Sequence, residues 1–507
     1  MNMDRRGIFS GALLMMIGTF ISRLLGLLRE SIMAFLFGAS PQYDAFLIAF
    51  LVPNLLRQLL AEGALSSSFV PVFNEYLLKD GKDEAWKLLN MLLNLILLLF
   101  GFIIPLGYSL LPYLVKILAP GFSRDTYELC ISLSKITLPF ILFISLAALT
   151  MGVLNSFGNF FVPGVASGFF NISIIIFALL FYKSFGIYAV ALGTTIGGAF
   201  QWLFQLFWLR NLGWRYKIVL DLNHKGVREI GAMMVPLTFS LAINQIQNLV
   251  DKIIASLLSP GGISVINYAF RLYQLPLGVF AVSFSTVALP LLSKDVLRDG
   301  SKGLEETLSS ALRLALFVVI PASIFILIYS PALVSLLFYR GAFSEWAFEN
   351  TYRALMFYSL GLAFSALTHI SLRAFYALKD TKTPALIGFW VVILNAVLNL
   401  IFGKLFGPPG LALATSFASA VNLFLLWRTL RLRGIYFGLH KFLSSLALPS
   451  LIFLSISLFS FNFLSNIWVS MLLSLLSFIP YVIISRILGI EEANIFIERI
   501  FLPFRRS

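Results

Sequence analysis

The sequence has very few of the residues from which enzymes usually build catalytic centres. Its 507 residues include one cysteine, Cys130, which excludes an internal disulfide and a cysteine-based metal centre. The three histidines, His224, His369 and His440, lie far apart in the sequence, so we expect no zinc or proton-relay cluster. The chain contains no Walker loop, HExxH or GxSxG motif. We therefore expect a protein that is not an enzyme. Any transport would draw on an ion gradient, the membrane potential or the substrate's own gradient.

Charged residues are also scarce. They make up 12% of the chain, against about 25% in soluble domains. Hydrophobic residues make up 59%, and the mean hydropathy is +0.92. A membrane β-barrel would need alternating segments of about ten residues, whereas the apolar runs here are long and continuous. The composition predicts an all-α polytopic membrane protein.

A helix that crosses a bilayer needs about 20 predominantly apolar residues. Scanning for such spans predicts about 14 transmembrane helices. The first span follows the residues MNMDRRG as a signal anchor does, and Arg23 and Arg29 interrupt the apolar core that a cleaved signal peptide needs. The predicted spans are 8–37, 44–78, 86–117, 127–154, 161–182, 187–209, 228–258, 263–296, 308–337, 347–378, 384–405, 410–432, 442–463 and 466–488.

The net charge of +14 has two explanations, nucleic-acid binding and basic loops on one side of a membrane. The second explanation fits the distribution of the charges. With both termini cytoplasmic, most loop lysines and arginines lie on the cytoplasmic side. The opposite side holds only Lys116, Arg124, Lys183, Arg340 and Lys404. We therefore predict cytoplasmic termini and no nucleic-acid partner.

The longest polar connection, residues 210–228, reads RNLGWRYKIVLDLNHKGVR. Trp214 and Tyr216 stand among basic residues there, which suits an interfacial loop lying on anionic lipid. The connection also separates two halves of the chain. It predicts an N-lobe at 1–209, a cytoplasmic linker at 210–227, a C-lobe at 228–432 and two C-terminal helices with a basic tail at 433–507.

A weak internal sequence repeat supports the division into two halves. The segment Tyr43–Asn54 resembles Tyr268–Gly278, and several prolines, including Pro53 and Pro276, recur at an offset of about 220 residues. An offset of six helices preserves direction through the membrane, so the two lobes of six helices form a parallel pseudo-twofold repeat. The last two helices fall outside it.

Four arginines interrupt the apolar stretches: Arg23, Arg29, Arg57 and Arg271. An ionised side chain at bilayer depth costs at least ~2.5–3.5 kcal/mol, so these residues predict a wet cavity or an anionic partner. Arginine stays ionised and binds phosphate oxygens bidentately, which favours a phosphate or diphosphate head group. Snorkelling to the interface is the alternative for Arg23 and Arg29.

Several other polar residues accompany these arginines. Ser264 lies seven residues before Arg271 and so on nearly the same helix face. Asp44 has a second interpretation, an N-terminal charge favoured by the helix dipole. Glu62 and Arg57 have one as well, an intramembrane salt bridge that only shapes the fold. The candidate set beside the arginines is Glu30, Asp44, Glu62 and Ser264.

A second polar group stands in the second half of the chain. Asp251 interrupts an apolar helix, Asn395 and Asn399 lie one turn apart, and Thr415 follows in the next span. Oxygen ligands of this kind suit a hard cation such as sodium. Helix–helix hydrogen bonds are the alternative interpretation.

Several segments of the chain resemble one known family. SRLLGLLRE, YDAF and VPNLLRQLLAEGALSSSFVPVFNEY, with RLYQLPLGVFAVSFSTVALPLLSK and RAFYALKDTKTPALIG further on, are similar to segments of the MurJ (MviN) family. These are lipid II flippases of the multidrug/oligosaccharidyl-lipid/polysaccharide exporter superfamily. The PNLLRxxxAEGAxSxxFVP pattern is specific, and the resemblance spans most of the chain.

The resemblance implies two six-helix lobes, with two extra helices that form a groove for a polyprenyl tail. It implies that Arg23, Arg29, Arg57 and Arg271 meet the diphosphate–sugar head group of lipid II. Asp44 and Glu62 match acidic positions of the family, and Ser264 matches a cavity serine. Glu30 stands where several members have Asp, and Phe270 stands where some members have an acid just before the arginine. These correspondences are implied by the family pattern.

The resemblance further implies a sodium site on Asp251, Asn395, Asn399, the Leu411 carbonyl and Thr415. Where a member has Asp, this chain has Asn399, which weakens the site or changes its charge balance. We expect no other cofactor. The partners would be lipid II and membrane lipids, for a monomer in the bacterial cytoplasmic (inner) membrane.

Three rival functions are open. An exporter of another polyprenyl-linked glycan would share the fold and the basic residues. A non-transporting scaffold for cell-wall enzymes has no need of these arginines. An exporter of small cationic drugs is disfavoured because a cationic chamber repels such substrates.

Overall fold

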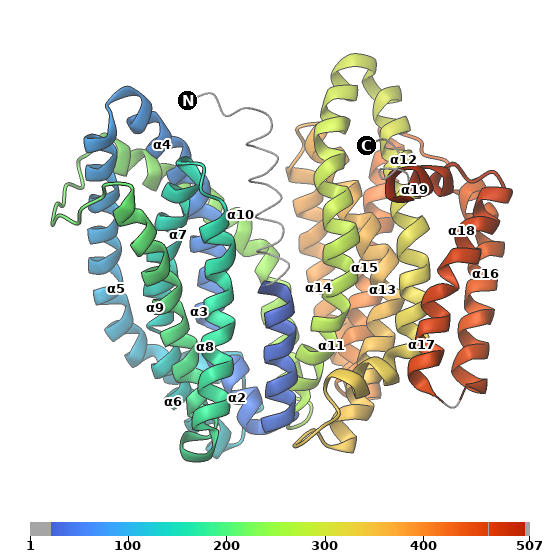
Figure 1. Cartoon of the computed structure of the whole chain (residues 1–507), viewed down its shortest axis with the longest axis horizontal. Helices are drawn as coiled ribbons and strands as arrows, with labels where there is room; N and C mark the ends of the chain where they lie inside the picture. The colour runs from blue at the N-terminus through green and yellow to red at the C-terminus, as the bar shows by residue number, and fades with distance from the viewer. Residues whose placement is uncertain (1–21, 465, 502–507) are drawn as a thin grey trace. The chain divides into compact units, whose positions relative to one another are not determined.

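The computed structural model describes residues 22–464 and 466–501, without the side chains of 60–63, 239–244, 282, 283, 286, 287 and 498–501. Figure 1 shows that this part of the chain is built from helices. Ten of the described helices are long and apolar enough to cross a membrane, which confirms the all-α membrane class. Four predicted spans are not among these ten. They are 8–37, which is described only from residue 22, and 44–78, 228–258 and 263–296, which are broken or carry several polar residues.

The first compact unit comprises Met1–Ser264 and Arg340–Phe343. Large apolar side chains such as Phe69, Phe73 and Phe140 are fully buried in its core. Its helices run from blue to green in Figure 1. They are residues 22–37, α2 (Pro41–Ala49), α3 (Leu51–Leu56), the π-helix η1 (Arg57–Leu65), α4 (Ser66–Lys79), α5 (Lys82–Leu118), α6 (Arg124–Thr137), α7 (Phe140–Ser156), α8 (Phe161–Phe185), α9 (Ile187–Asn211) and α10 (Lys225–Ser256).

The second compact unit comprises Val265–Tyr339 and Ser344–Ser507. Its core includes the fully buried Phe317 and Phe375 and the buried ring of Tyr481. The elements are α11 (Gly262–Pro276), the π-helix η2 (Leu277–Val282), α12 (Ser283–Leu337), α13 (Glu345–Ala377), α14 (Lys382–Phe406), α15 (Pro409–Leu432), α16 (His440–Phe463), α17 (Ile467–Leu476), α18 (Phe478–Ile487) and α19 (Glu491–Phe501). The first three residues of α11 belong to the first unit.

The long helix α12 is two helices that meet at Gly300. This residue has φ 62° and ψ −136°, a conformation that glycine adopts without steric cost. The C-terminal helices α16, α17 and α18 pack against one another, and all three also contact α12, where the Tyr481 hydroxyl of α18 donates to the Phe317 carbonyl at 2.8 Å. The Tyr329 hydroxyl of α12 meets the Ser460 and Ser470 hydroxyls at 2.7 and 2.8 Å, so buried polar contacts hold this appendage to the second unit.

The two π-helices stand at equivalent places in the internal repeat. In the first half η1 begins four residues after Pro53, and in the second half η2 begins directly after Pro276. Proline removes a backbone donor, and π-helical turns are rare and often occur at functional sites. Both halves of the repeat therefore change helix type close to the proline of their shared motif.

The compact units follow contacts between helices, whereas the predicted lobes follow the sequence repeat. α10 lies after the predicted linker at 210–227, but it packs against η1, α4 and α5. It therefore clusters with the first unit.

Exposed apolar side chains line the outer faces of several helices. On α14 they include Leu386, Phe389, Trp390 and Ile393, of which Leu386 and Trp390 are each 63% exposed. A contiguous exposed apolar face of this kind needs a lipid environment. The pattern agrees with helices that span a bilayer.

Candidate functional site

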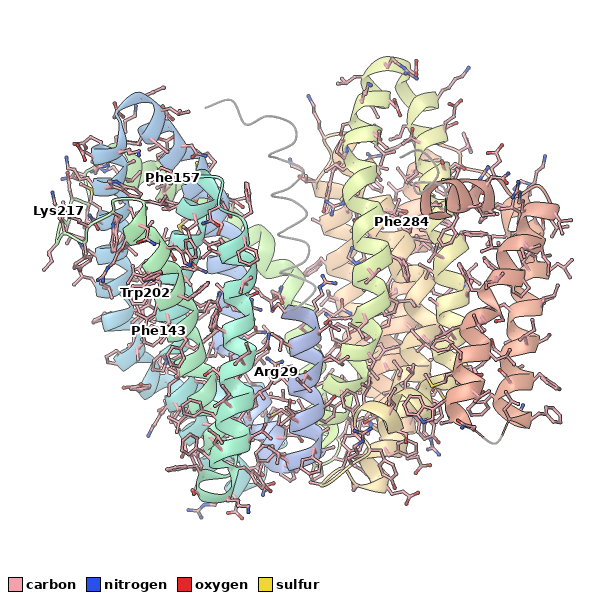
Figure 2. All side chains as sticks on the ribbon, in the orientation of Figure 1. Arg29, Phe143, Phe157, Trp202, Lys217 and Phe284 are labelled. Atoms are coloured by element: carbon pink, nitrogen blue, oxygen red, sulfur yellow. The ribbon has the colours of Figure 1, made fainter. Side chains whose placement is uncertain are left out.

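Arg29 and Glu30 form an ion pair on the helix 22–37. The Arg29 Nη2 lies 2.6 Å from Glu30 Oε1, and the two side chains are 13% and 2% exposed. The guanidinium also lies 5.8 Å from the centre of the Phe170 ring, within the range of a cation–π contact. Figure 2 labels Arg29 on this helix. The pairing assigns Glu30 a definite role, because it compensates the charge of Arg29.

Two residues that the sequence analysis did not select complete this network. The Tyr43 hydroxyl donates to Glu30 Oε2 at 2.8 Å, and Arg29 Nη1 donates to Asn171 Oδ1 at 3.1 Å. Tyr43 stands next to Asp44 in the YDAF motif, so its position was a usable signal. Asn171 is a single amide in an apolar helix, 142 residues from Arg29, and only helix packing reveals its role.

Arg57 is the first residue of η1 and is half-buried. Its Nε and Nη2 donate to Asn54 Oδ1 at 3.1 and 3.0 Å, so the side chain folds back along its own helix. The side chain of Glu62, the other charged residue of this segment, lies outside the described ones. The predicted partnership of Arg57 and Glu62 therefore stays a prediction.

Arg23 is exposed, one turn before Leu27 on the helix 22–37. Its apolar neighbours Leu24 and Leu28 are 52% and 50% exposed. Arg23 thus differs from Arg29, whose charge is held against other side chains of the first unit.

Asp44 is 3% exposed and binds the start of α11. Its Oδ1 accepts from the Ser264 backbone N–H at 2.8 Å and from the Ser264 hydroxyl at 2.6 Å. Its Oδ2 accepts from the Gly261 N–H at 2.7 Å. A carboxylate at these orphan N–H groups is stabilised by hydrogen bonds and by the helix dipole. Asp44 stands in the first turn of α2, and it also accepts hydrogen bonds from the N-terminus of α11, at least 217 residues away.

Arg271 lies on α11 in the second unit and is exposed. Ser264, predicted to share its face, is fully buried and bound to Asp44. Two residues beyond Arg271, the Tyr273 hydroxyl donates to Ser365 at 2.7 Å, and Ser365 donates to Ser419 at 3.1 Å. Hydroxyl groups therefore connect α11 with α13 and α15 inside the second unit.

The candidate sodium ligands of the second unit form two hydrogen-bonded pairs, in which Asn395, Asn399 and Leu411 are buried and Thr415 is half-buried. Asn399 Nδ2 donates to Asn395 Oδ1 at 3.0 Å, and the Thr415 hydroxyl donates to the Leu411 carbonyl at 3.0 Å. The Asn395 Nδ2 is buried and has no hydrogen-bond partner among the described residues. Asp251 belongs to the first unit. The oxygen atoms of this set have the hard-ligand chemistry that sodium needs. The set also contains the amide group of Asn395, whose buried N–H donors lack a partner among the described residues, which is rare in proteins.

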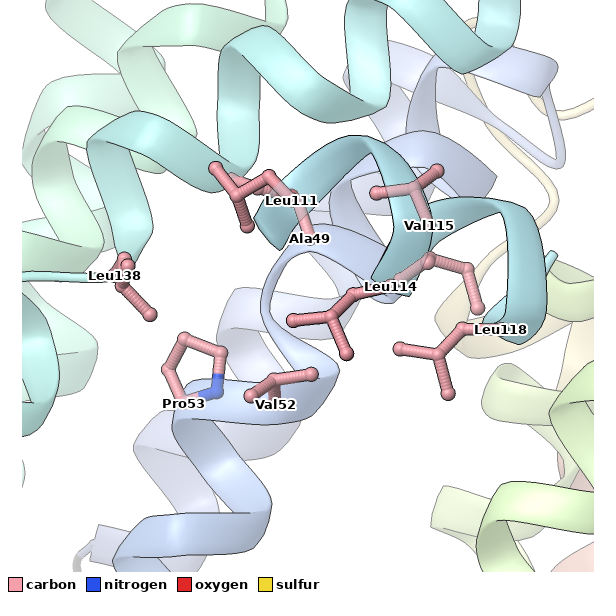
Figure 3. A pocket seen from close by; sticks show the side chains of 10 residues that line it. Ala49, Val52, Pro53, Leu111, Leu114, Val115, Leu118 and Leu138 are labelled. Atoms are coloured by element: carbon pink, nitrogen blue, oxygen red, sulfur yellow. The ribbon is translucent and has the colours of Figure 1, made fainter. Parts of the chain in front are cut away.

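A small cavity lies beside Pro53 in the first unit (Figure 3). It is lined by leucines of α5, by Val52, Ala49 and Leu138, and by the single hydroxyl of Ser134, which donates to the Cys130 carbonyl. An apolar lining of this kind cannot compensate a charged head group. This cavity is therefore not a binding site for the charged head group that the arginines are expected to bind.

Comparison with known proteins gives a consistent result. Residues 33–481 match the family model described as "Lipid II flippase MurJ". A "Probable lipid II flippase MurJ" of Buchnera aphidicola subsp. Baizongia pistaciae is 36% identical over 416 residues, which cover 81% of each chain. The "Lipid II flippase MurJ" of Burkholderia cenocepacia is 35% identical over 426 residues, which cover 82% of this chain and 83% of the relative.

Solved structures agree with these sequence matches. One described as "Lipid II flippase MurJ, inward closed conformation" has a TM-score of 0.80 and 31% identity, covering 96% of this chain and 100% of that one. An inward-facing multidrug resistance MATE family transporter of the MOP superfamily has a TM-score of 0.69 at 16% identity, covering 84% of this chain and 98% of that one. The second likeness shows a shared fold.

Proposed function

This chain belongs to the lipid II flippase MurJ family, and we propose that it moves undecaprenyl-diphosphate-linked peptidoglycan precursor from the inner to the outer leaflet by alternating access. The fold and the family support the reaction class. The arginines support the head group, because guanidinium groups bind phosphate oxygens bidentately and remain charged at any physiological pH.

The observation that carries this proposal is the way in which Arg29 is held. Glu30 and Asn171 engage two of the five N–H groups of its guanidinium among the described contacts. Tyr43 in turn fixes the second oxygen of Glu30. A guanidinium fixed on one side presents its remaining donors in a set direction, which lowers the entropic cost of binding a diphosphate.

The charge balance supports the same substrate. Glu30 compensates the charge of Arg29, and three further arginines, Arg23, Arg57 and Arg271, stand among the candidate residues. Arg23 and Arg271 are exposed, and Arg57 is half-buried. Guanidinium groups suit a diphosphate and oppose a cationic drug.

The location follows from the same reasoning. We place the protein in the bacterial inner membrane with both termini cytoplasmic, because most loop lysines and arginines then lie on the cytoplasmic side. We further propose a monomer in which α16, α17 and α18 accompany the polyprenyl tail. Exposed leucines and isoleucines on these helices, including Leu451, Leu472 and Ile483, support that contact.

Sodium is proposed as a coupling ion. Asn395, Asn399, the Leu411 carbonyl and Thr415 would hold it in the second unit, and the ion would supply a local positive charge whose occupancy biases the transport cycle. Asp251 is the proposed acidic ligand.

A translocation assay with purified lipid-linked precursors in liposomes tests this function. The vesicles hold a set membrane potential, with and without sodium, and the readout is head-group exposure on the far leaflet. We expect lipid II to move and to compete with other polyprenyl-diphosphate glycans. Preferential movement of another glycan would favour the related exporter, and absence of movement with every precursor would favour a scaffold.

A further inference from the structure

The segment 214–221, between α9 and α10, is neither helix nor turn, and it lies against α5 in the first unit. Two asparagines of α5, one turn apart, hold it there. Asn90 Nδ2 donates to the Arg215 carbonyl at 3.1 Å, and Asn94 Nδ2 donates to the carbonyls of Lys217 and Val219 at 3.0 and 2.9 Å. Alternate carbonyls of the segment thus receive side-chain donors.

The asparagine oxygens complete this attachment. Asn90 Oδ1 accepts from the Trp214 indole N–H at 3.1 Å, and Asn94 Oδ1 accepts from the Tyr216 hydroxyl. Trp214 is 4% exposed and packs in the core of the first unit. Satisfied carbonyls matter here, because irregular backbone is costly wherever water is scarce.

Three apolar side chains of the segment and the residue that follows it are exposed. Ile218 is 86% exposed, and Leu220 and Leu222 are 49% and 58% exposed. Asn94 lies about 18 Å along the helix from the start of α5, given a rise of 1.5 Å per residue. The exposed lipid-facing leucines of α5 begin three residues later, at Leu97. The apolar side chains of the segment therefore lie level with the beginning of the lipid-facing surface.

Basic side chains surround these apolar ones. Arg215 and Lys217 are exposed on the segment itself, and Figure 2 shows Lys217 projecting away from the helices of the first unit. Arg210, Lys225 and Arg228 are exposed at the ends of α9 and α10, while the acids nearby include Asp221, Glu229 and, close to Lys225, Glu75 of α4. This excess of positive charge complements anionic lipid head groups.

We propose that residues 214–222 form a lipid-binding strap on an anionic leaflet. Ile218, Leu220 and Leu222 insert at the boundary between head groups and acyl chains, while Arg215 and Lys217 pair with lipid phosphates. Asn90 and Asn94 allow the segment to lie at this depth, because they donate hydrogen bonds to backbone carbonyls that water would otherwise have to satisfy. The assignment to the cytoplasmic leaflet rests on the proposed orientation, whereas the lipid contact itself does not.

Depth-dependent fluorescence quenching tests the strap without any transported substrate. The full chain with Cys130→Ala and Ile218→Cys is labelled with an environment-sensitive fluorophore and placed in vesicles that carry a nitroxide-labelled lipid. The matched control is Asp125→Cys, an exposed residue at the start of α6. We expect blue-shifted emission and quenching about twofold stronger at 218 than at 125.

The charge contribution is measured by changing the lipid. Quenching at 218 is expected to be stronger in mixed phosphatidylglycerol–phosphatidylcholine vesicles than in phosphatidylcholine alone, and Arg215→Gln with Lys217→Gln should remove that difference. Leu222→Cys repeats the measurement at a second position. Emission like that in water at both 218 and 222 in anionic vesicles would overturn the proposal, and would leave the proposed transport function untouched.

Discussion

Asp44 Oδ1 accepts two hydrogen bonds from Ser264, one from its backbone N–H at 2.8 Å and one from its hydroxyl at 2.6 Å, across 220 residues of sequence. A motif residue of the first half thereby fixes the beginning of the helix that carries Arg271. The contact gives two predicted site residues a structural role beside any role in binding.

Replacing Asp44 with Asn should destabilise the protein, because an amide keeps the shape but accepts fewer and weaker hydrogen bonds than a carboxylate. We expect a loss of about 1–3 kcal/mol, seen as a lower thermal unfolding midpoint in detergent. Ser264→Ala should cost less, and in the double variant the two effects should be smaller than additive. Full additivity would contradict a direct coupling between these residues.

Arg271→Ala should reduce lipid II translocation by at least about tenfold, since a charge-assisted contact to phosphate contributes ~1.5–3 kcal/mol. Arg271→Lys should keep part of the activity, because a lysine retains the charge and loses the bidentate geometry. Membrane insertion and the unfolding midpoint should stay unchanged, because Arg271 is exposed. Normal head-group translocation by the alanine variant would refute the proposed role.

Tyr43→Phe should lower translocation several-fold, because the buried Glu30 loses one of its hydrogen-bond donors and the orientation of Arg29 relaxes. Tyr481→Phe is the matched control, since it also removes a buried hydroxyl, the donor to the Phe317 carbonyl, but lies far along the sequence in the second unit. The rate of translocation and the unfolding midpoint are measured for both. Equal loss of translocation at equal stability would argue against a specific role of Tyr43.

Asp380 should make stability depend on pH in a window from about 4 down to about 2. The Thr383 hydroxyl and backbone N–H, followed by Arg433, lower the pKa of Asp380 from 3.8 to about 2. A lowered pKa contributes stability that is complete above the unfolded value and is lost as the pH falls through the folded value. Asp380→Asn should therefore unfold at a lower temperature than the natural chain at pH 6, and the difference should shrink toward pH 2.

Asn399→Asp should lower the sodium concentration needed for half-maximal translocation, since it adds a negative ligand beside Asn395. Thr415→Val should raise that concentration by removing a hydroxyl oxygen. A sodium titration at fixed membrane potential measures both. If translocation by the natural chain and by both variants is independent of sodium, the buried amides serve only helix packing.

The sequence by itself determined the membrane class, the family and the arginines, because each depends on local properties. The length of an apolar run decides whether a helix can cross a bilayer, and an arginine inside such a run is conspicuous wherever the helix packs. The similar segments around Pro53 and Pro276 likewise indicated an internal repeat, and a π-helix begins after each of these prolines.

Only the tertiary structure decided which polar groups meet. Glu30 binds Arg29 and Tyr43, Asn171 reaches Arg29 from 142 residues away, and Asp44 caps α11 instead of serving only its own helix. The asparagines of α5 hold the segment 214–221 in the same way. Hydrogen-bond partners of this kind depend on how helices pack, and neither composition nor spacing along one helix encodes that packing.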